Sequence, residues 1–217
     1  PRANFGTHPW SLSGGGASNL LTLVCDRSDR MLAKAADSIG ITSFTLEDDV
    51  FIQPADVIRR HSLRPVRPMV VGDELRDWGQ RDHSSAIFPY DDDLQPFESV
   101  RNFQSSAEFM WPFRSNLQNN KMFGNQTKVE AGLKWYEFGR LTKNKLATAL
   151  SITFAFVATH NHFVLDRGGK VFKQSAPVIK LPAGASVEDH LRLLGLLNSS
   201  VACFWLKQNC HDKGNGG

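Results

Sequence analysis

Two histidines, His160 and His162, come nearest in this sequence to the residue types and spacing of a metal site. On a strand, residues two apart point to the same face, so two imidazoles there could share one ion. A metal centre needs a third and a fourth ligand, and the sequence places none beside this pair. Structural or DNA-contacting histidines are the favoured interpretation, and a metal-dependent nuclease built on the pair stays open as an alternative.

Three other groups of residues have the types found in catalytic or phosphate-binding sites, but their arrangement does not favour such a site. Cys210, His211 and Asp212 are adjacent, and adjacent side chains seldom converge on one substrate. The acidic pairs at 48–49 and 92–93 fall in expected turns, without an apolar setting that would raise a pKa for acid–base work. The glycines at 14–16 are not followed by the Gly-Lys-Ser/Thr of a phosphate loop. We therefore expect no catalytic site within this chain.

Positive charge is concentrated in one stretch, residues 134–180. It holds eight cations and two anions, a net charge of +6, whereas the whole chain carries +3 and the remainder therefore −3. Trp135, Tyr136 and Phe138 stand near the start of this stretch. Cations with interleaved aromatic residues are typical of a surface that binds a polyanion. A solvated basic face is the alternative, and composition does not decide between the two.

Composition otherwise describes an ordinary globular protein. A length of 217 residues suits one large domain or one and a half smaller ones. Three cysteines without a CxxC pair fit the reducing cytoplasm and argue against a disulfide framework. No apolar run reaches membrane-spanning length and no signal peptide opens the chain, so we expect a cytoplasmic protein without a membrane partner. Because the chain starts at Pro1, not Met, and ends in Gly-Asn-Gly-Gly, we expect its two ends to be cuts in a longer protein or the limits of ordered chain.

The elements that would position these groups are short and of mixed type. Helical spacing predicts helices, and runs of apolar or β-branched residues predict strands. In the first half the pattern predicts a helix over 18–38 stopped by Gly40, strands over 41–45 and 50–52, a helix over 54–61, a strand at 70–71, a helical turn over 73–78, a strand over 85–88, and a helix over 103–117 interrupted at Pro112.

The second half is predicted to be richer in strands. Strands are expected over 149–159 and 162–165, with a hairpin turn at 166–169, a return strand from Lys170 and a strand over 176–181. Ser186 and Asp189 form a capping-box pattern for a helix to Leu197, and a second helix follows over 201–208. We therefore predict an α+β fold with a strand-rich central segment and flanking helices. Its two parts are an acidic, mixed α/β region, 1–108, and a basic strand-rich core with closing helices, 109–217.

Several segments together resemble a known family: 111–114 (WPFR), 124–127 (GNQT), 135–137 (WYE), 154–182 (FAFVATHNHFVLDRGGKVFKQSAPVIKLP) and 194–208 (LGLLNSSVACFWLKQ). They are similar to the C-terminal half of the large adenine-specific DNA methyltransferases of bacteriophage-exclusion, or phage growth limitation, systems. These enzymes are relatives of single-chain restriction–modification enzymes, and this half is similar to a TaqI-like specificity domain. The resemblance implies an α+β target-recognition domain that docks on double-stranded DNA and selects the site.

The resemblance also places catalysis elsewhere. Adenine methyltransferases grip the flipped base with an Asn/Asp/Ser-Pro-Pro-aromatic loop, and this chain contains no Pro-Pro. A glycine-rich S-adenosylmethionine loop is missing as well. The chain is therefore expected not to be an enzyme and to hold no cofactor itself. Its bacterial parent, in a phage-defence (BREX) or restriction–modification system, would use S-adenosylmethionine through an upstream methyltransferase domain and flip the adenine with residues found there.

Within this interpretation the basic segment supplies the DNA contacts. Six cations are the expected phosphate contacts: Arg140, Lys143, Lys145, Arg167, Lys170 and Lys173. Trp135, His160 and Asn161 are the candidates for contacts to bases. A protein-interaction scaffold whose basic face binds an acidic partner protein remains the rival from another class. The recognised DNA sequence does not follow from these residues.

Overall fold

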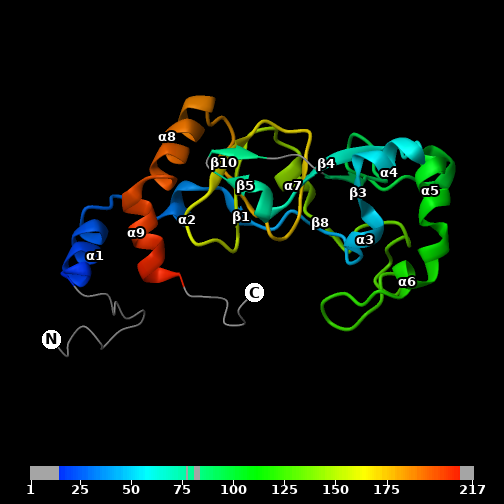
Figure 1. The fold of residues 1–217 in the computed structure, drawn as a ribbon, viewed down its shortest axis with the longest axis horizontal. Coiled ribbons are helices and arrows are strands. Elements are labelled where there is room, and N and C mark those ends of the chain that lie inside the picture. Colours follow the sequence, from blue (N-terminus) through cyan, green and yellow to red (C-terminus); the bar gives the residue numbers. More distant parts are fainter. Residues whose placement is uncertain (1–14, 77, 81–83, 211–217) are drawn as a thin grey trace.

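The computed structural model of the chain describes residues 15–76, 78–80 and 84–210. Helices and short strands are mixed along it, which confirms the predicted α+β class. The molecule is elongated, with α8 (Val187–Leu197) and α9 (Ser200–Asn209) toward one end and α5 (Gln104–Met110) and α6 (Arg114–Asn119) at the other (Figure 1). Gly14, His211 and Asp212 lie outside the described residues.

One four-stranded sheet lies beneath α8, in the strand order β1-β12-β9-β10. Its strands are β1 (Ser38–Gly40), β12 (Val178–Lys180), β9 (Ser151–Phe154) and β10 (Phe163–Asp166), and each neighbouring pair is antiparallel. Ile152, Phe163 and Ile179 of the sheet pack with Leu194 of α8 in one apolar cluster. The middle strands therefore come from the basic stretch, and the edge strand β1 comes from the acidic region.

The second four-stranded sheet has the order β11-β4-β7-β3. It contains β11 (Val171–Phe172), β4 (Val66–Val70), β7 (Ser84–Ile87) and β3 (Ile52–Pro54). The strands β11 and β4 are parallel, and the other two pairs are antiparallel. Two short ribbons complete the described strands: β2 (Ser43–Phe44) with β8 (Arg140–Leu141), and β5 (Leu75–Arg76) with β6 (Gly79–Gln80).

Short helices cover the sheets and connect them. The remaining helices are α1 (Ala17–Asp26), α2 (Leu32–Ala35), α3 (Asp48–Phe51), α4 (Ala55–Arg60), α7 (Lys143–Leu146) and the 3-10 turns η2 (Gly72–Glu74), η3 (Val100–Phe103) and η4 (Trp111–Phe113). The capping box before α8 is confirmed, because the Ser186 hydroxyl accepts from the Asp189 amide while the Asp189 carboxylate accepts from Ser186.

An aromatic core joins the basic stretch to the second sheet. Phe51, Phe88 and Tyr90 surround the buried ring of Phe138, with ring centroids 5.1, 5.9 and 5.6 Å away. The Phe138 amide also donates to the Tyr90 hydroxyl over 2.7 Å. Edge-to-face packing of this kind adds to the free energy gained by burial. This core therefore holds the backbone close to Arg140, which lies two residues beyond Phe138.

Several predicted elements are wrong in detail. The expected helix over 18–38 is divided into α1 and α2, and Gly40 lies in β1 instead of ending a helix. The expected strand at 50–52 is mostly helical, since α3 includes Val50 and Phe51. The expected hairpin at 166–172 does not form, because β11 leaves the sheet of β10 and pairs with β4. The hairpin that does form joins β9 and β10 through the loop 155–162.

The two sequence regions share both large sheets and the aromatic core, since β1 pairs with β12 and β4 with β11. Their division at 108/109 stays a prediction. None of the described helices combines the length and the apolar character needed to cross a membrane.

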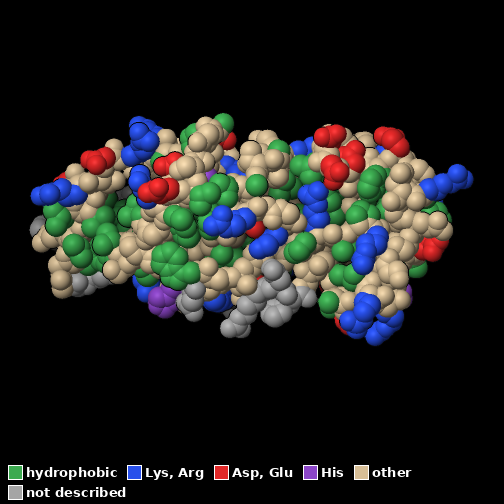
Figure 2. Space-filling model, turned by 90° about the horizontal axis from the view of Figure 1, so that it is seen from above, with side chains coloured by type: hydrophobic (Ala, Val, Ile, Leu, Met, Phe, Trp, Pro, Cys, Tyr) green, Lys and Arg blue, Asp and Glu red, His purple; other side chains and the backbone are tan. Residues whose placement is uncertain are grey.

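Seen from above, hydrophobic side chains gather over the end that carries α8 and α9, and Lys and Arg side chains lie separately along the middle (Figure 2). Leu191, Leu196 and Val201 are among the exposed residues of these two helices.

Candidate nucleic-acid interface

Arg140 lies on β8, directly opposite Phe44 of β2, and its side chain is exposed. Lys145 follows on α7. Partial burial, together with the nearby positive charge of Arg140, lowers the pKa of the Lys145 ammonium. Neither cation has an ion pair within the described part of the chain. Two like charges held close together favour a bound anion, because the anion relieves their repulsion.

Lys143, at the start of α7, is already engaged: its ammonium donates to the side-chain oxygen of Gln95 over 2.6 Å. This hydrogen bond is to a neutral group, so the positive charge of Lys143 is not compensated by it. The side chain is nevertheless directed toward Gln95, which lies in the acidic turn that follows β7. Lys143 is therefore a weaker phosphate candidate than Arg140 or Lys145.

Two of the remaining cations are paired with carboxylates. The Lys170 ammonium lies 3.5 Å from Asp166 and donates to Gln80 over 2.8 Å. Lys173 lies 2.8 Å from the carboxylate of Asp48 in α3. The Lys170–Gln80 and Lys173–Asp48 contacts join the basic stretch to the acidic region, and the two ion pairs partly neutralise these charges within the fold. Arg167, in the turn after β10, is exposed and has no ion pair among the described residues.

The three residues expected to contact bases differ in accessibility. Trp135 is half-buried and packs edge-to-face against Trp111 and Tyr136, at ring-centroid distances of 6.0 and 5.4 Å. Asn161 donates to the carbonyls of Leu197 and Ser199, over 2.6 and 3.2 Å, and so ties its loop to the junction of α8 and α9.

His160 is exposed in the loop 155–162, and its ring nitrogen Nδ1 lies 3.0 Å from the Thr159 hydroxyl. His160 and His162 both lie in this loop, so the strand geometry that would place the two rings on one face is not present. Among the described residues, no three His, Cys, Asp or Glu side chains are grouped closely enough to hold a metal ion. The structure gives the metal-nuclease alternative no support.

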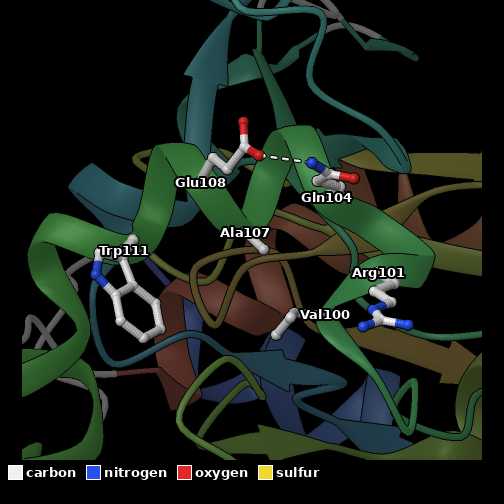
Figure 3. Close-up of a pocket in the computed structure, with 6 residues that line it drawn as sticks. All are labelled: Val100, Arg101, Gln104, Ala107, Glu108 and Trp111. Carbon is white, nitrogen blue, oxygen red and sulfur yellow. Dashed lines mark hydrogen bonds between the residues drawn. The ribbon is translucent and has the colours of Figure 1, made fainter.

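A shallow hollow of about 500 Å³ lies on η3 and α5, lined by Val100, Arg101, Gln104, Ala107, Glu108 and Trp111 (Figure 3). The carboxylate in this lining, that of Glu108, already accepts a hydrogen bond from the side chain of Gln104, one helical turn earlier, over 2.8 Å. Trp111, half exposed, forms one side of the hollow. The lining offers apolar contact without a group poised for proton or nucleophile chemistry.

Sequence reasoning missed two residues of this region, Lys128 and Phe123. The Lys128 side chain is fully buried, and its ammonium donates to the carbonyl of Trp135 over 3.1 Å and to that of Glu137. Burial lowers its pKa to about 8, against the partial opposition of Glu137 and Glu47. Nothing in the sequence marks it, since lysines are almost always exposed. Phe123 precedes a Gly-Asn turn and follows Lys121, a setting that could have indicated an exposed aromatic ring.

Comparisons with known proteins find similarity both in structure and in sequence. No protein-family model matches the chain. The Type IIL restriction–modification enzyme MmeI, whose structure was determined in complex with DNA, has a similar fold, with a TM-score of 0.54 at 14% identity. The match covers 84% of this chain and 23% of MmeI, and at this identity it shows the fold alone.

The adenine-specific methyltransferase PglX of Streptomyces coelicolor (strain ATCC BAA-471 / A3(2) / M145) is 41% identical to the chain over 212 residues. This match covers 97% of the chain but only 17% of PglX. The expected resemblance to adenine-specific methyltransferases is thereby confirmed. The chain corresponds to a small segment of such an enzyme, consistent with a C-terminal region.

Proposed function

We propose that this chain recognises double-stranded DNA as the target-recognition portion of an adenine-N6 DNA methyltransferase in a phage-defence (BREX-type) or restriction–modification system. The similarity to PglX over nearly the whole chain carries the proposal, because the chain matches one segment of an adenine-specific methyltransferase. The shared fold with MmeI, an enzyme whose structure was determined with DNA, supports a DNA-contacting role for that segment.

The arrangement of charge fits this role. Arg140, Lys145 and Arg167 are the cations of the basic stretch most available to phosphates, since Lys170 and Lys173 are held in ion pairs. Phosphate contacts fix the position of a protein on a duplex, whereas contacts to base edges select the sequence. His160, exposed in its loop, keeps a role at the bases. Trp135 and Asn161 instead support the surfaces around them.

Methyl transfer belongs to the rest of the parent enzyme. An upstream methyltransferase domain would bind S-adenosylmethionine and the flipped adenine, in the bacterial cytoplasm where the DNA lies. The chain alone should therefore not methylate DNA, because it has no Pro-Pro motif to grip the base. Purified chain, mixed with tritiated S-adenosylmethionine and plasmid DNA, should leave the DNA unlabelled. Labelling above background would assign catalysis to this chain and contradict the proposal.

Binding is tested by fluorescence anisotropy with labelled duplexes at several salt concentrations. Each phosphate contact contributes about 0.9 to the slope of log affinity against log salt. Changing Lys143 and Lys145 together to Ala should flatten that slope by up to about two units and weaken binding to all sequences alike. Because Lys143 also donates to Gln95, the pair Arg140→Ala and Lys145→Ala should reach this limit more closely.

A matched control removes two cations outside the basic stretch. Lys34 on α2 and Lys207 on α9 are both exposed, and their double alanine variant changes the net charge by the same amount. The control should keep most of the salt slope. Equal losses in both double variants, or no loss in either, would show that the basic stretch is a solvated face. Failure of the unmodified chain to bind duplexes of any length would favour the protein-interaction scaffold.

A further inference from the structure

Phe123 is the most exposed large apolar side chain in the described part of the molecule, with 94% of its surface open to solvent. It lies in the loop 121–127 between α6 and β8, on the side of the molecule that Figure 1 shows at its lower edge. A phenylalanine left in water gives up the free energy that its burial would supply, about 1.5–3 kcal/mol. Single exposed apolar residues are common on protein surfaces, so Phe123 indicates a binding contact only together with what lies beside it.

The loop that carries Phe123 is a defined turn. Lys121 and Thr127 form a bridge between its two sides, and the Met122 amide donates to the Gln126 carbonyl over 2.8 Å. Gly124, with a φ of 99°, provides the left-handed conformation that closes the turn immediately after Phe123. These contacts hold the ring outward, so its exposure is a property of the fold.

The base of the loop is fixed to the protein interior on both sides. On one side, the Asn120 side chain donates to the Glu47 carboxylate over 3.1 Å. On the other side, the buried ammonium of Lys128 donates to the carbonyls of Trp135 and Glu137 and lies 5.5 Å from the ring centre of Phe51. The loop therefore has little freedom to fold back and cover Phe123.

Phe123 lies beside the cations proposed to meet phosphates. Its ring centre is 6.2 Å from that of Phe44, and Phe44 is directly opposite Arg140 across the β2–β8 ribbon. Directly opposed residues of an antiparallel pair point to the same face, so Phe44 and Arg140 share one side. Lys145 is close enough to Arg140 for the two charges to repel. Phe123 thus adjoins Phe44, Phe44 lies opposite Arg140, and Arg140 is near Lys145, and neither cation has an ion pair among the described residues.

We propose that Phe123 contacts bases of the bound DNA directly, entering a groove and stacking on or between base pairs while Arg140 and Lys145 hold the adjacent phosphates. This rests on the proposed function of the chain as a DNA-recognition module. Apolar wedges beside cations are how many proteins kink or unstack a duplex. A protein-binding anchor would instead be expected within a larger apolar patch, whereas the loop of Phe123 also carries Lys121 and Gln126, and the neighbouring Phe44 lies opposite the cation Arg140.

The test compares Phe123→Ala and Phe123→Trp with the unmodified chain, using labelled duplexes of mixed sequence and matched duplexes that contain 2-aminopurine. Phe123→Ala should weaken binding about 5- to 100-fold, as expected for one lost stacking contact, and abolish the rise in 2-aminopurine fluorescence. The salt slope should not change, because no charge is removed. Phe123→Trp should retain the affinity and the fluorescence change, since it keeps an aromatic face.

Leu196→Ala is the control, because Leu196 is an exposed apolar residue of α8 at the opposite end of the molecule. It should leave both signals unchanged, and all variants should melt at the temperature of the unmodified chain. If Phe123→Ala binds as the unmodified chain does while Arg140→Ala/Lys145→Ala is weakened, DNA docks here without Phe123 and the ring serves another partner. That outcome overturns this inference and leaves the proposed function standing. Absence of duplex binding by the unmodified chain would overturn both.

Discussion

The buried ammonium of Lys128 makes the stability of this protein depend on pH in the alkaline range. Burial lowers the pKa of Lys128 from its usual 10.5 to about 8. Between these two values the unfolded chain holds a proton that the folded chain has released, so the free energy of unfolding rises with pH. The stabilisation that comes from deprotonation of Lys128 is complete above about pH 10.5 and is lost as the pH falls through 8.

The size of this effect follows from the two pKa values, which differ by about 2.5. From pH 7.5 to pH 9.5, linkage gives a rise of about 1.8 kcal/mol in the free energy of unfolding from Lys128 alone. Lys180 has its pKa lowered to about 8 for the same reason, and its ammonium donates to the carbonyls of Thr148 and Leu150. The two lysines together should therefore supply about 3.6 kcal/mol over this interval.

Lys128→Met isolates the contribution of Lys128. Methionine keeps a long apolar side chain in the site, so little cavity forms. At pH 7.5 the substitution removes two hydrogen bonds to buried carbonyls, which destabilises the fold by about 1–3 kcal/mol each. It also removes the buried charge of Lys128, whose cost of about 3.4 kcal/mol is thereby relieved, so the two effects offset each other. The absolute stability at neutral pH is therefore a poor test, whereas the rise from pH 7.5 to 9.5 should shrink by about half.

The measurement is urea unfolding followed by tryptophan fluorescence at both pH values, for the unmodified chain, Lys128→Met, Lys180→Met and the double variant. Each single variant should lose about half of the rise and the double variant nearly all of it. A rise of equal size in all four proteins would refute the assignment of the alkaline stabilisation to these two ammonium groups.

Three further substitutions test the packing. Gly72→Ala should destabilise the fold by about 1–3 kcal/mol or more, since its new Cβ would lie 2.3 Å from the Ser175 carbonyl oxygen; thermal melting measures the loss. Gly195→Ala, on the open side of α8, should instead stabilise by about 0.8–1 kcal/mol, and a lower melting temperature would contradict this. Phe156→Asp should leave the melting temperature nearly unchanged, because that side chain is 63% exposed and lies in the loop after β9.

Sequence patterns predicted several features whose formation depends on residues close together in the chain. The capping box at Ser186 and Asp189 located the start of α8, and the proline at 112 marked the break between α5 and α6. Both depend on residues within one or two turns of each other, where backbone chemistry alone determines the outcome. The helix α4 was likewise found from Pro54 and the apolar spacing that follows it.

Pairing between distant segments was not predictable in this way. The glycine turn at 168–169 has hairpin chemistry, but the strand after it continues into another sheet because β4, a hundred residues earlier, offers a pairing edge. The tryptophans show the same limit. Trp135 is a sequence-based candidate for contacts to bases, yet its ring is packed against Trp111 and Tyr136, and Trp111 is the more exposed of the pair.

The six cations proposed to meet phosphates differ in their surroundings within the fold. Net charge counts Lys173 and Arg140 alike, although Lys173 is paired with Asp48 and Arg140 has no ion pair within the described residues. Whether a lysine contacts solvent, a carboxylate or a backbone carbonyl depends on tertiary packing, which a count of charges does not contain. Which of these side chains meet DNA stays a prediction.

The strand order of the first sheet limits how segments of this chain could be exchanged with those of its relatives by recombination. The strand β12 lies between β9, its neighbour in the basic stretch, and β1, which is more than a hundred residues earlier in the chain. A chimera that took residues 134–180 from one relative and the preceding region from another would join mismatched partners at β1–β12 and at β4–β11. Unpaired strand edges of this kind promote aggregation. Crossover points should therefore lie outside both sheets, so that the whole interleaved unit is inherited together.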